Sequence, residues 1–165
     1  MIPDFEYLSP QEFDIVATGE FTHFVLWIES VLEEIIATHF VASTAKQSDF
    51  VRLVLRPEGI STIHRIGIVK GILDSLDLTE TDAKEWKAAL NGAEKVIRRR
   101  NILSHGIGLG PNPYSAKGVL RIKLASRSGK YRILEISADQ YRHIRASASS
   151  NITALQELRK LTFGF

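Results

Sequence analysis

The chain has 165 residues, enough to bury one substantial hydrophobic core but few for two. Hydrophobic residues make up 44% and charged residues 24%, which is the usage of a folded globular protein and excludes disorder over the whole chain. Cysteine is absent, so disulfides, thiolate metal sites and cysteine nucleophiles are excluded. We expect a single domain over residues 1–165.

The amino-terminal part predicts a cytoplasmic protein with no membrane span. Residues 1–14 hold four acidic residues and no basic residue, unlike a secretory signal peptide. The apolar stretch 21–41 contains Glu29, Glu33 and Glu34, and three carboxylates are costly in a bilayer.

Charge is unevenly distributed along the chain. Residues 1–94 hold 7 Lys or Arg against 16 Asp or Glu, whereas residues 95–145 hold 12 against 2. The net charge of +2 hides this difference. Two interpretations are open: the basic part meets an anionic partner, or it pairs with the acidic helices of the same chain or of a second subunit.

The helical spacing of apolar residues predicts four main helices, at about 10–41, 62–76, 82–104 and 138–161. Ser9 and Glu12 form a capping box at the start of the first helix. Ser61 is the expected cap of the second helix, and Thr79 belongs to a polar cluster that opens the third.

Shorter elements fill the remaining segments. A polar connection is expected at 42–48, and a short helix is favoured over an extended run at 49–55. Two short β-like runs, with the apolar residues Val119, Ile122 and Leu124 in the first and Tyr131, Ile133 and Ile136 in the second, flank the turn signal Ser128-Gly129, which predicts a β-hairpin.

The predicted fold class is mainly α: a four-helix bundle with a β-hairpin between the third and fourth main helices. A bundle is expected because four helices, each with one apolar stripe, bury those stripes by packing against one another. Trp27 and Trp86 fall on apolar stripes and are expected in the core.

The end of the third predicted helix carries the residues with most chemical content. It reads Arg98-Arg99-Arg100-Asn101-Ile102-Leu103-Ser104-His105. The pattern Arg100-Asn101-x-x-x-His105 resembles the motif of the HEPN superfamily (higher eukaryotes and prokaryotes nucleotide-binding). The resemblance implies a HEPN-like helical bundle that pairs as a homodimer, with the two motifs facing each other in a cleft, and metal-independent cleavage of single-stranded RNA.

The resemblance also implies a role for each motif residue. Arg100 stabilises the transition-state phosphate, His105 acts as acid and base, and Asn101 orients the other groups. No metal or cofactor is expected, because the chain has no HExxH or comparable cluster of ligands.

The spacing of the motif residues raises a geometric question. On a straight helix Arg100 and His105 point about 140° apart, whereas Arg98 and His105 share a face. If Arg100 is the functional arginine, we expect a frayed or tightened last turn at His105, or partners across a subunit boundary. Arg98 is the second candidate.

Basic residues beside the motif and on the hairpin are candidates for binding the RNA backbone: Arg98, Arg99, Arg121, Lys123, Lys130 and Arg132. The expected partners are RNA, a second copy of the chain and a cognate antitoxin or regulatory protein, in a toxin–antitoxin system or in defence against phage.

Other interpretations stay open. A non-catalytic HEPN-like module would bind nucleotide, RNA or a protein, and a structural dimerisation domain would bind no nucleic acid. A basic run at a helix carboxyl end is favoured by the helix dipole alone, and His105 then serves only to cap the helix. The alternation over 121–124, with Arg121 and Lys123 on one face and Ile122 and Leu124 on the other, also fits a plain hairpin with one polar face.

Overall fold

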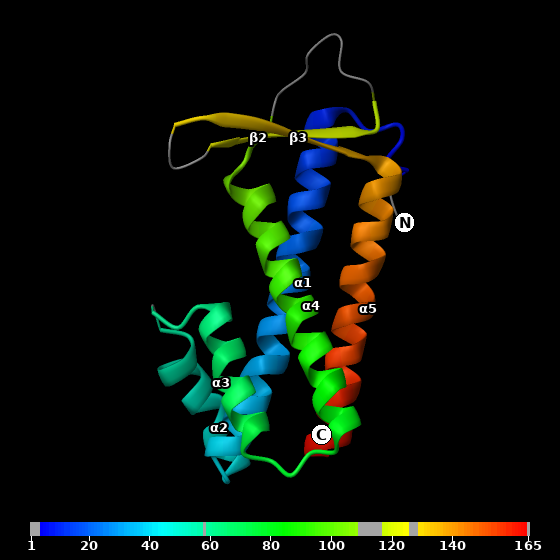
Figure 1. Ribbon diagram of the computed structural model, residues 1–165. Helices are drawn as coiled ribbons and strands as arrows, with labels where there is room; N and C mark the ends of the chain where they lie inside the picture. Colours follow the sequence, from blue (N-terminus) through cyan, green and yellow to red (C-terminus); the bar gives the residue numbers. More distant parts are fainter. Residues whose placement is uncertain (1–3, 58, 109–116, 126–128, 165) are drawn as a thin grey trace. The chain divides into compact units, whose positions relative to one another are not determined.

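The computed structural model describes residues 4–57, 59–108, 117–125 and 129–164. This part of the chain is mainly helical (Figure 1). In chain order its helices are α1 (Pro10–Phe40), α2 (Thr44–Phe50), the π-helix η1 (Val51–Leu55), α3 (Thr62–Asp74), α4 (Glu80–His105) and α5 (Ala138–Phe163). The strands β1 (Ile107–Gly108), β2 (Val119–Ala125) and β3 (Tyr131–Ser137) form an antiparallel sheet in that order. The predicted mainly helical class and the hairpin before the last helix are confirmed.

The predicted capping residues set the starts of three helices. The Ser9 hydroxyl and backbone N–H donate to the Glu12 carboxylate at 2.7 and 2.9 Å, and these bonds lower the pKa of Glu12. The Ser61 hydroxyl accepts a backbone N–H at the start of α3. The Thr79 hydroxyl accepts the Asp82 N–H at 3.1 Å at the start of α4.

One expected connection is helical instead. Residues 44–50, which overlap the polar connection expected at 42–48, form α2, and residues 51–55 continue as η1. Ala45, Lys46 and Gln47 are good helix formers, so the segment is helical although it buries no side chain. The helix favoured for 49–55 is present, as the end of α2 and as η1.

The two tryptophans differ in burial. Trp86 is 1% exposed, as expected, but Trp27 is 53% exposed, so its predicted core position is wrong. The buried stripe of α1 runs through Phe24, Ile28 and Leu32, and Trp27 lies about 100° around the helix from Ile28, near the middle of that stripe. Among the described helices, α1 alone is long and apolar enough to cross a membrane, a test that the core helix of a soluble protein also passes.

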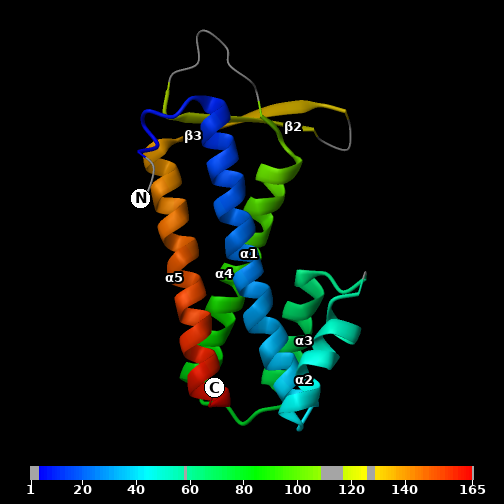
Figure 2. The ribbon, with the colours of Figure 1, turned by 180° about the vertical axis from the view of Figure 1, so that it is seen from behind.

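The chain forms two compact units. Unit 1 comprises Met1–Phe24 and Val96–Ser149, and unit 2 comprises Val25–Lys95 and Ser150–Phe165. In unit 1 the strands lie across the start of α1, the end of α4 and the start of α5 (Figures 1 and 2). Phe5, Phe13 and Phe21 pack around the buried Tyr141 ring, with centroid separations of 4.8, 5.1 and 6.2 Å.

Unit 2 places α2 and α3 beside the second half of α1 (Figures 1 and 2). An ion pair of 3.2 Å joins Arg65 on α3 to Glu29 on α1. On the other side, the Asn151 amide of α5 donates to the Ala89 carbonyl of α4 at 2.9 Å. Polar contacts therefore fix the helices of this unit in addition to its apolar core.

Candidate functional site

The motif segment forms the last two turns of α4, within unit 1. The helix is regular through His105, and the Gly106 N–H donates to the Ile102 carbonyl at 2.9 Å, which is the i→i+4 bond of an α-helix. The last turn is therefore neither frayed nor tightened. Of the two arrangements that would let Arg100 and His105 act together, only contact across a subunit boundary is left.

Three motif-segment residues share one side of α4. Arg98, Asn101 and His105 are exposed and fall within about 60° of one another around the helix. Arg100 is half-buried and points about 140° away from His105. One chain thus presents Arg98, Asn101 and His105 together but separates Arg100 from His105.

The motif side chains are available for a ligand. Within the described part of the chain, the side chains of Arg100, Asn101 and His105 make no hydrogen bond or ion pair. His105 is not held as a helix cap by any described group, although it stands in the last turn of α4.

The hairpin presents one lysine beside an exposed aromatic ring. Strand register puts Arg121, Lys123 and Tyr131 on the same face of the sheet. Lys123 Nζ lies 4.0 Å from the centroid of the Tyr131 ring, which is 61% exposed. Arg121 is paired with Glu135 at 2.8 Å. This face therefore offers a flat ring and an adjacent cation, which suit a nucleobase and a phosphate.

The structure does not gather all the predicted RNA-binding residues. Arg132 pairs in register with Leu124, which puts it on the opposite face of the hairpin from Lys123. Lys130 is exposed and follows Gly129, whose φ of 76° fits the predicted turn, whereas Ser128 lies outside the described residues. The six predicted residues thus occupy at least two surfaces.

Part of the basic segment is neutralised inside unit 1. Arg145 pairs with Glu20 at 3.0 Å, and Arg142 pairs with Asp4 and Glu6 at 3.4 and 3.2 Å. Pairing within the chain therefore accounts for some of the charge asymmetry. It does not extend to Arg99 or Arg100, which make no ion pair with a described residue.

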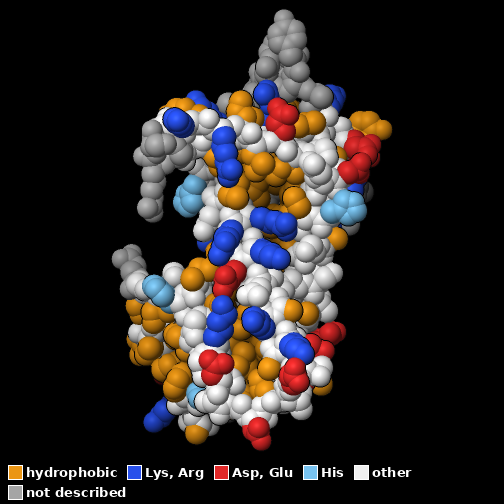
Figure 3. All heavy atoms as spheres, viewed as in Figure 1, with side chains coloured by type: hydrophobic (Ala, Val, Ile, Leu, Met, Phe, Trp, Pro, Cys, Tyr) orange, Lys and Arg blue, Asp and Glu red, His pale blue; other side chains and the backbone are white. Residues whose placement is uncertain are grey.

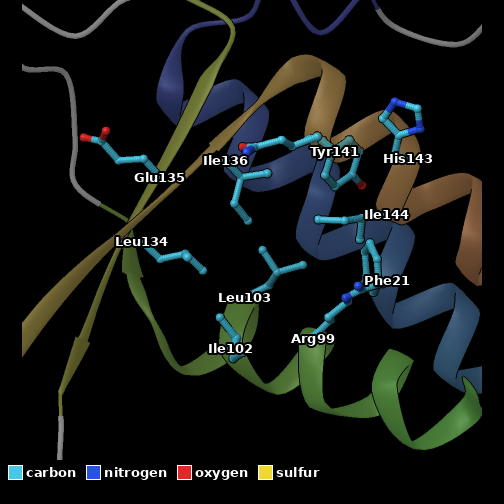
Figure 4. A pocket seen from close by; sticks show the side chains of 11 residues that line it. Phe21, Arg99, Ile102, Leu103, Leu134, Glu135, Ile136, Tyr141, His143 and Ile144 are labelled. Carbon is cyan, nitrogen blue, oxygen red and sulfur yellow. The ribbon is translucent and has the colours of Figure 1, made fainter. Parts of the chain in front are cut away.

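A pocket of about 460 Å³ in unit 1 was not anticipated from the sequence. Figure 4 shows side chains of α4, β3 and α5 pointing toward a common space, and Figure 3 shows hydrophobic side chains exposed below the sheet with Lys and Arg beside them. Arg99 lines the pocket, but Arg100 and His105 do not. No periodic pattern signals the pocket, because its walls come from four segments, on α1, α4, β3 and α5, that are far apart in the sequence.

One buried hydroxyl in the pocket wall is fixed. The Tyr141 hydroxyl donates to the Glu20 carboxylate at 2.8 Å. Burial, together with that bond, raises the pKa of Tyr141, so its hydroxyl stays protonated. Tyr141 is therefore a neutral part of the wall and not a source of charge.

Among the described residues, no three His, Asp or Glu side chains are grouped so that they hold a metal ion. Comparison with models of protein families, with curated proteins and with solved structures finds no match to this chain.

Proposed function

We propose that the protein is a metal-independent endoribonuclease of HEPN type that cleaves single-stranded RNA. The observation that carries the proposal is the exposed Arg98, Asn101 and His105 side of α4, which sets an imidazole and a guanidinium beside solvent. Arg98 and His105 are about 10 Å apart along the helix axis, a span that a long arginine side chain bridges to reach one phosphate.

The chemistry asked of these residues needs no metal. An imidazole removes the proton of a ribose 2′-hydroxyl, the oxygen attacks phosphorus, and a second acid protonates the departing 5′-oxygen. The products are a 2′,3′-cyclic phosphate and a 5′-hydroxyl. Arginine stabilises the extra negative charge on the phosphate oxygens. Asn101 orients the phosphate or the imidazole by hydrogen bonds.

A homodimer completes the proposed site. One chain offers a single histidine in the motif, whereas the reaction needs a base and an acid. Two copies facing each other supply both His105 imidazoles, and they bring Arg100 of one copy within reach of His105 of the other. A HEPN-like four-helix bundle, a cytoplasmic location and a restraining antitoxin or regulatory protein belong to the same proposal.

The test is cleavage of fluorescent single-stranded RNA in excess EDTA. The wild-type protein should cut it, and His105→Ala should lose at least about 100-fold in rate because general acid–base catalysis contributes that much or more. His23→Ala removes another exposed histidine, on α1, and is the matched control. Wild-type rates in a folded His105→Ala protein, checked by circular dichroism, would overturn the proposal.

The second candidate is a non-catalytic RNA-binding module. The exposed Tyr131 ring beside Lys123 favours it, because that pair binds single strands without any catalytic group. This function predicts RNA affinity that falls with salt and with Tyr131→Ala, but no cleavage by the wild type. RNA cleavage that depends on His105 would support the endoribonuclease over the non-catalytic module.

A further inference from the structure

The pocket of unit 1 has mostly apolar walls. They are formed by Ile102 and Leu103 of α4, Leu134 and Ile136 of β3, and Ile144 of α5 (Figure 4). Its volume of about 460 Å³ lies in the range of small-molecule sites, about 300–1,000 Å³. Apolar side chains around a cavity of this size favour a hydrocarbon or aromatic body.

The charge of the pocket comes from Arg99. This arginine is half-buried, and its guanidinium makes no hydrogen bond or ion pair with any described residue. The carboxylate in the lining, Glu135, points away from the pocket in Figure 4 and is bound by Arg121 on the other face of the sheet. A partly desolvated guanidinium without a counter-charge is unfavourable until an anion pairs with it.

We propose that this pocket binds a small amphipathic carboxylate. The hydrocarbon body lies against Leu103, Leu134 and Ile144, and the carboxylate accepts hydrogen bonds from the Arg99 guanidinium. His143 is also in the lining and is exposed.

The site goes beyond the proposed nuclease. Arg99 lies between Arg98 and Arg100, so a bound carboxylate places negative charge on the turn that carries the motif. The pocket is therefore suited to a small-molecule effector. Binding is measured without RNA, so failure of this inference and failure of the nuclease proposal are distinguishable.

The experiment compares octanoate with 1-octanol by isothermal titration calorimetry on the full chain. Both ligands have eight carbons in an unbranched chain, and octanoate alone is charged. We expect octanoate to bind at least tenfold more tightly. Arg99→Gln should weaken the affinity for octanoate about tenfold, which corresponds to about 1.4 kcal/mol of binding free energy. It should leave the affinity for octanol unchanged.

Two further variants make the result specific. Lys95→Gln removes a charge one turn earlier on α4, outside the pocket lining, and should change neither affinity more than twofold. Ile144→Trp fills the pocket from a half-buried position and should weaken both ligands. Equal affinity for the two ligands, no effect of Arg99→Gln, or no octanoate binding at millimolar concentration by folded wild type would overturn the inference.

Discussion

Asp14 is a half-buried carboxyl group on α1 that makes the stability of unit 1 depend on pH. Burial raises the pKa of Asp14, and a hydrogen bond from Thr18 opposes the shift without cancelling it. Because the folded-state pKa lies above the unfolded value, the folded chain binds more protons in that window. The free energy of unfolding therefore falls as the pH rises through the raised pKa.

We predict that Asp14→Asn stabilises the protein at pH 7, because the neutral amide avoids the desolvation of a carboxylate. The advantage over wild type should disappear once the pH falls below about 4, where Asp14 is protonated in both states. Urea unfolding of the two proteins from pH 3.5 to pH 8 measures the difference. A difference that is constant over this range would contradict the assignment.

Arg65 of α3 is a buried cation shared by two carboxylates in unit 2. Its side chain is 8% exposed and lies 3.2 Å from Glu29 and 3.6 Å from Glu33, and it donates to the Leu55 carbonyl at 2.7 Å. Removing it leaves a buried carboxylate without this partner. We predict that Arg65→Met lowers the free energy of unfolding by about 3–5 kcal/mol.

Arg56 provides the matched control for that prediction. It also pairs with Glu33, at 3.1 Å, but its side chain is 67% exposed. Arg56→Met should therefore cost less than about 1 kcal/mol in the same urea titration. Similar losses for the two variants would show that Arg65 is not the residue that balances the buried charge.

At the scale of elements, the junction between α4 and the sheet requires a glycine. A Cβ at Gly106 would lie 2.0 Å from Ile122 Cγ2 and 2.7 Å from the Ile102 carbonyl oxygen, and the latter is backbone. We predict that Gly106→Ala lowers the free energy of unfolding by about 1–3 kcal/mol. It should also disturb the motif turn, because the same Ile102 carbonyl accepts the Gly106 N–H.

At Gly19 of α1, we expect the same substitution to change the free energy of unfolding in the opposite direction. Nothing lies within 4 Å of a Cβ at this exposed position. Gly19→Ala should raise the free energy of unfolding by about 0.5–1 kcal/mol, since alanine loses less conformational entropy in a helix. Urea denaturation of both variants tests the pair, and stabilisation by Gly106→Ala would refute the close packing at the junction.

At the scale of the whole molecule, the proposed homodimer makes it possible to test which of the two candidate arginines, Arg98 or Arg100, is functional. If Arg100 of one copy acts with His105 of the other, a heterodimer of Arg100→Ala and His105→Ala chains retains one intact residue of each kind. We predict that co-expressing the two variants under different affinity tags, and purifying through both, recovers RNA cleavage above that of either homodimer but below that of wild type, because one of the two His105 imidazoles is missing.

The same complementation test is repeated with Arg98→Ala in place of Arg100→Ala. Arg98 shares a side of α4 with His105 in the same chain, so mixing Arg98→Ala with His105→Ala should restore little if that pair acts within one copy. Loss of cleavage in Arg98→Ala that mixing with His105→Ala does not restore, together with full cleavage by Arg100→Ala alone, would reverse the assignment of the functional arginine.

Local sequence determined the helices and their starts. Ser9, Ser61 and Thr79 begin their helices as predicted, because a cap acts on backbone groups within three residues of itself. Two short β-like runs on either side of a glycine-containing turn likewise predicted the hairpin, and the pairing of β2 with β3 confirms it. The motif at 98–105 and the basic charge around it are also properties of the sequence alone.

Tertiary structure decided what those residues face. Trp27 has a helical spacing that fits a core, yet it is exposed because packing buried a neighbouring stripe of α1. Arg142 and Arg145 form ion pairs with acidic residues more than a hundred positions earlier in the chain. Arg99, by contrast, has no described counter-charge and lines a pocket built from α1, α4, β3 and α5. Contacts between segments that are distant in the sequence leave no local pattern. The sequence therefore identified the functional groups, whereas tertiary packing determined which of them come into contact.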